Sequence, residues 1–257
     1  MVVPIRWLSR QMGRRTNIVV VLAPILLYLP LALYPHNLHD LHATEQILVA
    51  SFTTSVADQT EQVKHNIALA CDKLNGAVIQ PRDIFSFNDT VGEGSARNGF
   101  APGRVLYRDR VVIEYGGGLC QVSSTLFNAL LLAGCTIIER HRHVHPVSYV
   151  PLGLDATIKF GKKDLRMKNP HAAALRIEAR MNEQSLIVAI TSEKNTPYQY
   201  EITTEEEEIT VPVFDDAAAV RQGISVYVYR RRLAGTKIIA TELLYRDFYP
   251  PAYAGGR

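Results

Sequence analysis

The chain has 257 residues, more than one average domain, and its 47% hydrophobic and 21% charged residues indicate a globular protein with a sizeable core and a short membrane segment. Its net charge of +3 includes four arginines before residue 18 with no acid among them, so the remainder is close to neutral. A near-neutral body excludes nucleic-acid binding by charge.

Residues 18–34 form an almost wholly apolar run, near the short end of what spans a bilayer. The arginines precede it, which predicts a cytoplasmic N-terminus and an extracytoplasmic body. No small-x-small cleavage site follows Tyr34, so the pattern favours an uncleaved signal anchor over a signal peptide. A buried core helix is the alternative. We expect a single-pass cell-membrane protein in which residues 1–45 form the cytoplasmic tip, the transmembrane helix and a linker.

The chain contains three cysteines, so at least one is free or pairs with another molecule. Cys71 lies on the apolar face of a predicted helix that ends at Asn75-Gly76, which favours a role as core filler. Cys120 and Cys135 stand at opposite ends of a later helix, about 22 Å apart at 1.5 Å per residue, too far for a disulfide.

A predicted hairpin over residues 105–115 leads into Gly116-Gly117-Gly118 and then a helix that ends before Gly134. Cys120 is in the first turn of that helix, where free N–H groups and the macrodipole favour the thiolate, the form that attacks carbonyls. Three consecutive glycines are most useful where something must approach the main chain closely. No Gly-Lys-Ser/Thr follows, so a nucleotide P-loop is not supported. The alternative is that Cys120 is a small buried hydrophobe.

A probable strand over residues 136–140 runs into His141, His143 and His145, which would share a face in an extended chain. Three interpretations remain open: a solvated polar patch, a zinc site, and a general base for Cys120. No Cys-x-x-Cys or His-Glu-x-x-His motif accompanies the histidines, so we predict no metal and no cofactor. A carboxylate that holds the base would come from Asp155 or Asp164, the nearest candidates in sequence.

From Pro170 onward alternating patterns predict strands over residues 175–181 and 186–190, and a hairpin that pairs 224–229 with 237–245. The acidic run 205–208 is interpreted as a solvated loop or strand edge. This region shows no evident chemistry. We predict an α+β fold in which the nucleophile-bearing helix packs on an antiparallel sheet, with residues 46–170 as the catalytic domain, residues 171–257 as a β-rich subdomain, and a single N-terminal transmembrane helix.

Several segments together resemble one family, the VanW domain, over about residues 52–169. The matching segments are Phe85–Gly92 (FSFNDTVG), Gly116–Ala129 (GGGLCQVSSTLFNA), Glu139–His143, Pro146–Thr157 and Asp164–Arg166. The family is named from glycopeptide-resistance clusters, and some members act as L,D-transpeptidases that build 3-3 cross-links through a cysteine thioester. The chain lacks the G5 or binding repeats that many members carry.

The resemblance implies a cysteine acyltransferase that acts on peptidoglycan stem peptides, with the family's cysteine at Cys120 and its histidine at His143. The rival hypothesis is a non-catalytic wall- or glycopeptide-binding module. The predicted catalytic residues are Cys120, His143, His141 and Asp155. The predicted substrate-binding residues are Gly116, Gly117, Gly118, Gln121, Ser123, Ser124, Arg140 and Tyr149.

Overall fold

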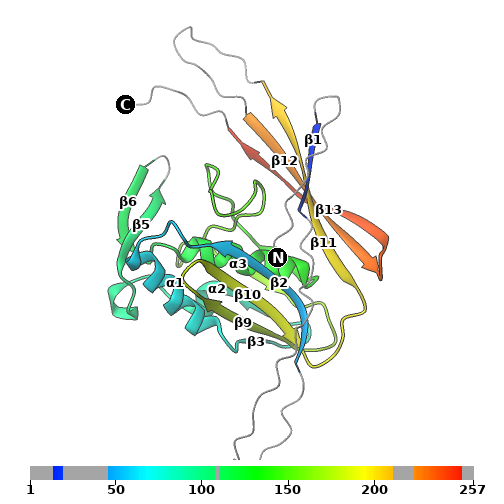
Figure 1. Ribbon diagram of the computed structural model, residues 1–257, viewed down its shortest axis with the longest axis horizontal. Coiled ribbons are helices and arrows are strands. Elements are labelled where there is room, and N and C mark those ends of the chain that lie inside the picture. Colours follow the sequence, from blue (N-terminus) through cyan, green and yellow to red (C-terminus); the bar gives the residue numbers. More distant parts are fainter. Residues whose placement is uncertain (1–13, 20–45, 108–109, 211–222, 251–257) are drawn as a thin grey trace, which may run out of the picture.

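A computed structural model of the chain describes residues 14–19, 46–107, 110–210 and 223–250. Strands dominate these ranges, which hold thirteen strands, three α-helices and one short 3₁₀ helix, η1 (Ala96–Asn98). Figure 1 shows two larger sheets with one helix, α3 (Leu119–Leu132), between them. This arrangement places the start of α3 inside the molecule.

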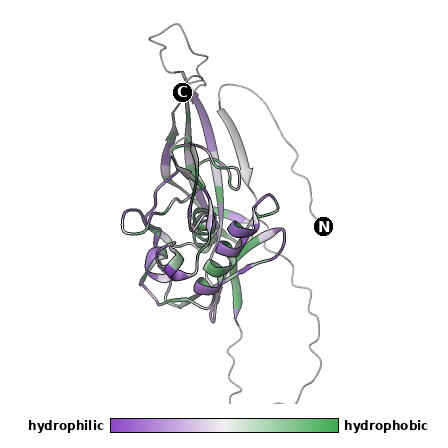
Figure 2. Ribbon diagram, turned by 90° about the vertical axis from the view of Figure 1, so that its left-hand side faces the viewer, coloured by the Kyte–Doolittle hydropathy of each residue, from purple (hydrophilic) through white to green (hydrophobic). Residues whose placement is uncertain are grey.

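The lower sheet is antiparallel, in the order β2 (Ile47–Ser55), β10 (Ser185–Ser192), β9 (Leu175–Met181), β3 (Val78–Ile79). Along β9, buried Leu175, Ile177 and Ala179 alternate with more exposed polar residues, the pattern of a strand covered on one face. The covering elements are α1 (Glu61–Leu74), which packs on β9, and α3, which packs on β2 and β10. The ribbon of the helices in Figure 2 alternates accordingly between hydrophilic and hydrophobic residues.

The upper sheet is also antiparallel, in the order β1 (Arg14–Val19), β11 (Gln199–Ile209), β12 (Gly223–Ala234), β13 (Lys237–Tyr249). Strands β12 and β13 form the predicted hairpin, turning at Gly235 with a positive φ of 61°. The acidic run is not a loop or an edge but part of β11, paired on both sides. Hydroxyls of β12 stabilise its carboxylates: Tyr227 donates to Glu207 (3.0 Å) and Tyr229 to Glu205 (3.4 Å).

Two smaller sheets and a short helix complete the fold. One sheet has the order β4 (Ile84–Ser86), β8 (Arg166–Lys168), β7 (Thr136–Glu139), and the other is the hairpin of β5 (Pro102–Tyr107) and β6 (Arg110–Tyr115). Helix α2 (Phe87–Val91) follows β4 directly, with the Ser86 hydroxyl accepting from the Asp89 N–H at its N-terminus. The hairpin and α2 stand on the side of the molecule where α3 begins (Figure 1).

Helix α3 is buried along nearly its whole length, because one side meets the lower sheet and the other meets β11. Val122, Leu126, Phe127 and Leu130 are fully buried apolar residues. Its polar residues are buried as well and have hydrogen-bond partners, as buried polar groups require. Its first turn, and with it Cys120, therefore has little freedom to move.

The predicted fold class was wrong. The described chain is mostly sheet rather than the mixed α+β domain that was predicted. None of the helices in the described ranges is long and apolar enough to cross a membrane. Ile18 and Val19, the first residues of the predicted transmembrane span, belong to strand β1, which pairs with β11; residues 20–34 of that span lie outside the described residues. Strand β1 itself is mostly polar, with the sequence Arg-Arg-Thr-Asn-Ile-Val, so the apolar run gave no signal of this strand.

The boundary predicted at residue 170 falls between β8 and β9. Strands from both sides of it share the lower sheet, since β2 and β3 precede the boundary and β9 and β10 follow it. The division into residues 46–170 and 171–257 stays a prediction. The chain downstream of residue 170 is nevertheless part of the sheet that supports α3.

Candidate active site

The glycine run makes a tight turn between β6 and α3. Gly116 and Gly118 have positive φ values of 79° and 103°, which only glycine adopts without strain. Gly117 is glycine for a different reason: a Cβ there would lie 2.7 Å from the carbonyl carbon of Gly103 and 2.8 Å from the carbonyl oxygen of Arg104. The turn therefore packs backbone against backbone. Of the three glycines predicted to bind substrate, only Gly116 lines the cleft described below.

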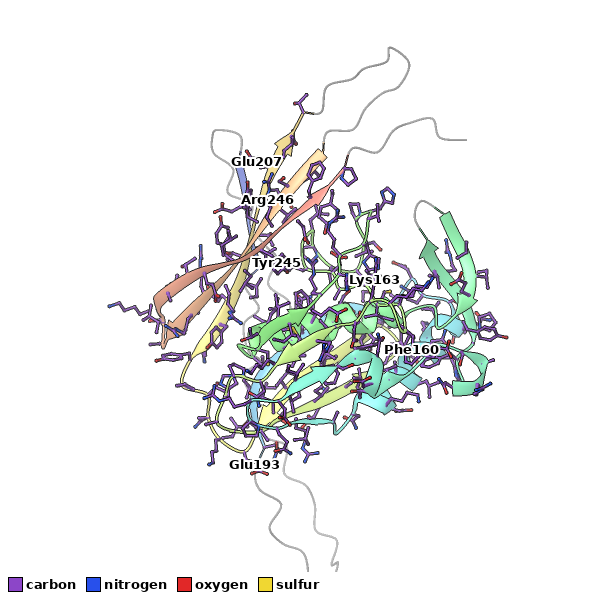
Figure 3. The ribbon with its side chains drawn as sticks, turned by 180° about the vertical axis from the view of Figure 1, so that it is seen from behind. Phe160, Lys163, Glu193, Glu207, Tyr245 and Arg246 are labelled. Atoms are coloured by element: carbon purple, nitrogen blue, oxygen red, sulfur yellow. The ribbon has the colours of Figure 1, made fainter. Side chains whose placement is uncertain are left out.

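Cys120 is partly buried and lines a cleft of about 530 Å³. Its Sγ lies 3.4 Å from the Thr157 hydroxyl and 3.8 Å from the carbonyl oxygen of Ile158. The cleft walls come from β6, the first turn of α3 and the loop between β7 and β8, which includes Phe160 and Lys163 (Figure 3). The lining includes Glu93, Glu114, Tyr115, Gly116, Leu119, Cys120, His143, His145, Thr157, Phe160 and Lys163.

His143 connects Cys120 to Asp155. The side chain of His143 interacts with Cys120 on one side, and its Nδ1–H donates to Asp155 Oδ2 over 2.6 Å on the other. The backbone N–H of His143 donates to the same oxygen, also over 2.6 Å. His143 is 9% exposed and Asp155 is 2% exposed, so water competes little for these contacts. The result is a thiol, an imidazole and a carboxylate in line, the arrangement of nucleophile, base and orienting group.

The electrostatics of this line favour a thiolate–imidazolium pair. Burial alone would raise the pKa of Cys120, but the hydrogen bond and the positive charge of His143 lower it below the ordinary 9.0. Burial would likewise lower the pKa of His143, but the bonds to Asp155 and Cys120 raise it from 6.5 to about 9. Burial opposes ionisation of Asp155 too, yet His143 and Arg140 lower its pKa. Each group therefore stabilises the charged form of its neighbour.

The first turn of α3 contains a backbone N–H group that is not used within the helix turn. The N–H of Leu119 donates to Gly116 O, and those of Gln121 and Val122 donate to Gly118 O. Within the described ranges, no acceptor is found for the N–H of Cys120 itself. A helix-terminal N–H beside the nucleophile is the kind of donor that holds an oxyanion in acyl transfer.

Arg140 does not reach the cleft as predicted but lies behind Asp155. Its Nη2 is 3.2 Å from Asp155 Oδ1, its Nε donates to the backbone oxygen of Asp155 (2.7 Å), and its Nη1 is 2.6 Å from Asp247 Oδ2. The guanidinium carbon lies 4.6 Å from the ring centroid of Tyr245, which Figure 3 shows on β13. Arg140 is thus part of the support of the site.

Three polar residues of α3 predicted to bind substrate have internal partners instead. Gln121 is 1% exposed and donates to Thr54 and to the carbonyl of Ser55, which ties α3 to β2. Ser123 donates to the carbonyl of Ala156, and Ser124 accepts from the N–H of Ala156 over 2.8 Å. These bonds tie α3 to the loop that carries Asp155, which meets His143, and Thr157, which meets Cys120.

The remaining predicted residues divide between the site and its surroundings. Tyr149 packs edge-on against the His143 ring, with centroids 6.5 Å apart. Burial, together with the negative charge of Cys120, raises the pKa of Tyr149 well above its ordinary value, so it stays neutral. His145 lines the cleft, whereas His141 turns away and bonds Glu139 at 2.9 Å. The three histidines therefore do not share one face.

Of the two candidate carboxylates, only Asp155 meets His143. Asp164 instead accepts from the Ser86 hydroxyl (2.6 Å) and the Asn88 N–H (2.9 Å), and so fixes the start of α2. In the parts of the chain that the structure describes, no group of three or more His, Cys, Asp or Glu is arranged to hold a metal ion.

Strand β13 supplies two residues to the site that were not predicted from the sequence. Tyr249 donates to Asp155 Oδ1 over 2.9 Å, and Asp247 pairs with Arg140. These residues are about a hundred positions from their partners in an ordinary alternating strand. No local pattern marks them. Thr157 lay within a matching motif, but nothing about a single threonine indicated contact with Cys120.

The fold and the site together define a protein of mostly antiparallel sheet with a cysteine–histidine–aspartate line at the start of a buried helix. The family model described as "VanW like protein" matches residues 62–191, about half of the chain. The chain belongs to the VanW family.

Two curated proteins are similar to this chain. The uncharacterized protein YoaR of Bacillus subtilis (strain 168) is 34% identical over 150 residues, which cover 58% of this chain and 49% of YoaR. The vancomycin B-type resistance protein VanW of Enterococcus faecalis (strain ATCC 700802 / V583) is 28% identical over 193 residues, 71% of this chain and 66% of that protein. The chain thus spans about half of the first and just under two thirds of the second. No solved structure matches it significantly.

Proposed function

We propose that this protein is a cysteine-dependent L,D-transpeptidase that joins peptidoglycan stem peptides by 3-3 cross-links. The observation that carries the proposal is the Cys120–His143–Asp155 line at an open cleft, in a chain of the VanW family. One relative in that family is named for vancomycin resistance, which is consistent with a role at the cell wall.

In the first half of the reaction, the Cys120 thiolate attacks the carbonyl between an L-centre and the terminal D-residue of a donor stem. The Cys120 N–H and the end of the α3 dipole stabilise the oxyanion. His143, as imidazolium, gives its proton to the departing amine as the C–N bond breaks. The terminal D-residue leaves, and the donor stem remains as a thioester on Cys120.

In the second half, an amine of a neighbouring stem attacks the thioester carbonyl. Neutral His143 takes a proton from that amine as the C–S bond breaks, which regenerates the thiolate–imidazolium pair. Asp155 keeps the ring in place throughout, since its Oδ2 holds both the Nδ1–H and the backbone N–H of His143. No external oxidant or energy source is needed, because one amide bond is exchanged for another.

The cleft carries the side chains that a branched peptide would require. Lys163 provides a positive charge for a terminal carboxylate, while Glu93 and Glu114 provide negative charges for an amine. Phe160, 49% exposed, and Tyr115, 50% exposed, offer apolar surface to the aliphatic parts of a stem. Since stem peptides lie outside the cytoplasm, we propose that the site works there.

The test is incubation of the purified full-length protein with tetrapeptide muropeptides, followed by mass spectrometry. We expect a dimer that lacks one terminal D-residue and an acyl adduct on Cys120. Cys120→Ala should give neither. Cys71→Ala is the matched control, because burial raises the pKa of that thiol to about 12 and it lies on α1.

The opposite outcome has a definite meaning. If wild type and Cys120→Ala bind intact muropeptide equally well and neither gives product, the protein is a wall-binding module and the proposal is wrong.

A further inference from the structure

Asp155 has two cationic neighbours that compete for its charge. Its Oδ2 accepts hydrogen bonds from the backbone N–H and the Nδ1–H of His143, each over 2.6 Å. Its Oδ1 lies 3.2 Å from Nη2 of Arg140. A carboxylate neutralised by an arginine does less to stabilise a nearby imidazolium, because the two cations repel one another. The charge available to His143 therefore depends on what else binds Arg140.

Arg140 is held more closely by Asp247 than by Asp155. The Nη1–Oδ2 distance to Asp247 is 2.6 Å, against 3.2 Å to Asp155. The side chains of Arg140 and Asp247 are 6% and 9% exposed, so solvent screens this pair poorly. Asp247 comes from β13, far beyond residues 62–191 that match the family model.

We propose that Asp247 is a positioning residue for the Cys120–His143 pair: by binding Arg140, it leaves Asp155 free to hold His143. The importance of this role for cross-linking rests on the proposed function, but the arrangement of charges does not. Asp247 touches neither His143 nor Cys120 directly, so it acts through Arg140 and Asp155.

In the described ranges, the charged and titratable groups around the Cys120–His143 pair come from helix α3, the β7–β8 loop and β13. Helix α3 contributes Cys120, the loop between β7 and β8 contributes Arg140, Arg142, His143, Tyr149 and Asp155, and β13 contributes Tyr245, Asp247 and Tyr249. The tyrosines are neutral because burial raises their pKa values. Among these groups, removal of Asp247 would leave three positive charges, on Arg140, Arg142 and His143. The negative charges that remain would be those of Asp155 and the Cys120 thiolate.

Tyr249 supports the same arrangement from β13. Its hydroxyl donates to Asp155 Oδ1 over 2.9 Å and accepts from the N–H of Gly153 over 2.9 Å. These bonds fix the carboxylate so that Oδ2 faces His143. Strand β13 thus delivers both a charge that offsets Arg140 and a hydroxyl that orients Asp155.

The experiment measures the pKa of His143 in the full-length protein by NMR titration of its histidine rings. The His143 signal is assigned by its loss in His143→Gln. In Asp247→Asn, we expect the pKa of His143 to fall by about one unit or more, which is about a tenfold lower imidazolium-to-imidazole ratio at a given pH near the midpoint. Asp247→Glu, which keeps the charge, should restore most of the difference.

Two further variants separate this role from general damage. Glu242→Gln removes the same charge from the same strand, but Glu242 pairs with Arg230 and is 61% exposed, so the pKa of His143 should not change. Arg140→Gln combined with Asp247→Asn removes the pair together and leaves no unpaired buried charge. The double variant should return the pKa of His143 towards the wild-type value, and it keeps the question answerable if Asp247→Asn does not fold.

An unchanged pKa of His143 in folded Asp247→Asn would overturn the inference, as would an equal fall in the double variant. Neither result depends on a muropeptide substrate. If wild type gives no cross-linked product while Asp247→Asn lowers the pKa of His143 as expected, the result counts against the proposed function alone.

Discussion

Replacing Asp155 by Asn should weaken the nucleophile as well as the base. The carboxylate oxygen that accepts both N–H groups of His143 becomes part of a neutral amide, so the imidazolium loses its buried counter-charge. The pKa of His143 should fall from about 9 towards its ordinary 6.5. By linkage, the pKa of Cys120 should rise, because the imidazolium is what lowers it.

The size of the effect follows from these values. At pH 7.5, a group with a pKa of about 9 is about 97% protonated, whereas one with a pKa of 6.5 is about 9% protonated, roughly a tenfold loss of the ion pair. Wild type should react as a thiolate at pH values below the ordinary thiol pKa of 9.0, and its acyl-transfer activity should decline above about pH 9 as His143 loses its proton. Asp155→Asn should therefore be alkylated at Cys120 about tenfold more slowly at pH 7.5.

The assay is the rate of iodoacetamide labelling of Cys120, followed by mass spectrometry of the peptide that contains it. Asp164→Asn is the matched control, since that carboxylate bonds Ser86 and the Asn88 N–H rather than His143. Equal labelling rates for wild type and folded Asp155→Asn across pH 6–9 would refute the ion-pair reasoning. Circular dichroism establishes that each variant is folded before its rate is compared.

Three other substitutions test the structural assignments. Gly117→Ala should lower the free energy of unfolding by about 3 kcal/mol or more, measured by urea denaturation, because its Cβ would meet the backbone of the β5 segment at 2.7 Å. Gly161→Ala, with a positive φ of 71° but open space around its Cβ, should cost only about 1 kcal/mol, and an equal loss in both would contradict the packing argument. His141→Ala should leave the labelling rate of Cys120 unchanged, since that imidazole bonds Glu139; slower labelling would show that it serves the nucleophile.

Local sequence determined the elements around the nucleophile. The three- and four-residue spacing of apolar side chains predicted a helix from Leu119, and the helix α3 begins there. The position of Cys120 in its first turn follows from that boundary alone. The alternating pattern on either side of Gly235 likewise predicted the β12–β13 hairpin. These features were readable because the residues that decide them lie within a few positions of one another.

Only the tertiary structure decided how the site is supported. The choice of Asp155 over Asp164, the inward turn of Gln121 and the part played by Asp247 all depend on contacts between segments far apart in the chain. Even the fold class was misjudged, because the pairing of strands into two large sheets depends on contacts between distant segments, such as β1 with β11. Periodicity records which face of an element is buried, but the identity of the group that meets a buried charge is fixed by the packing of the whole chain.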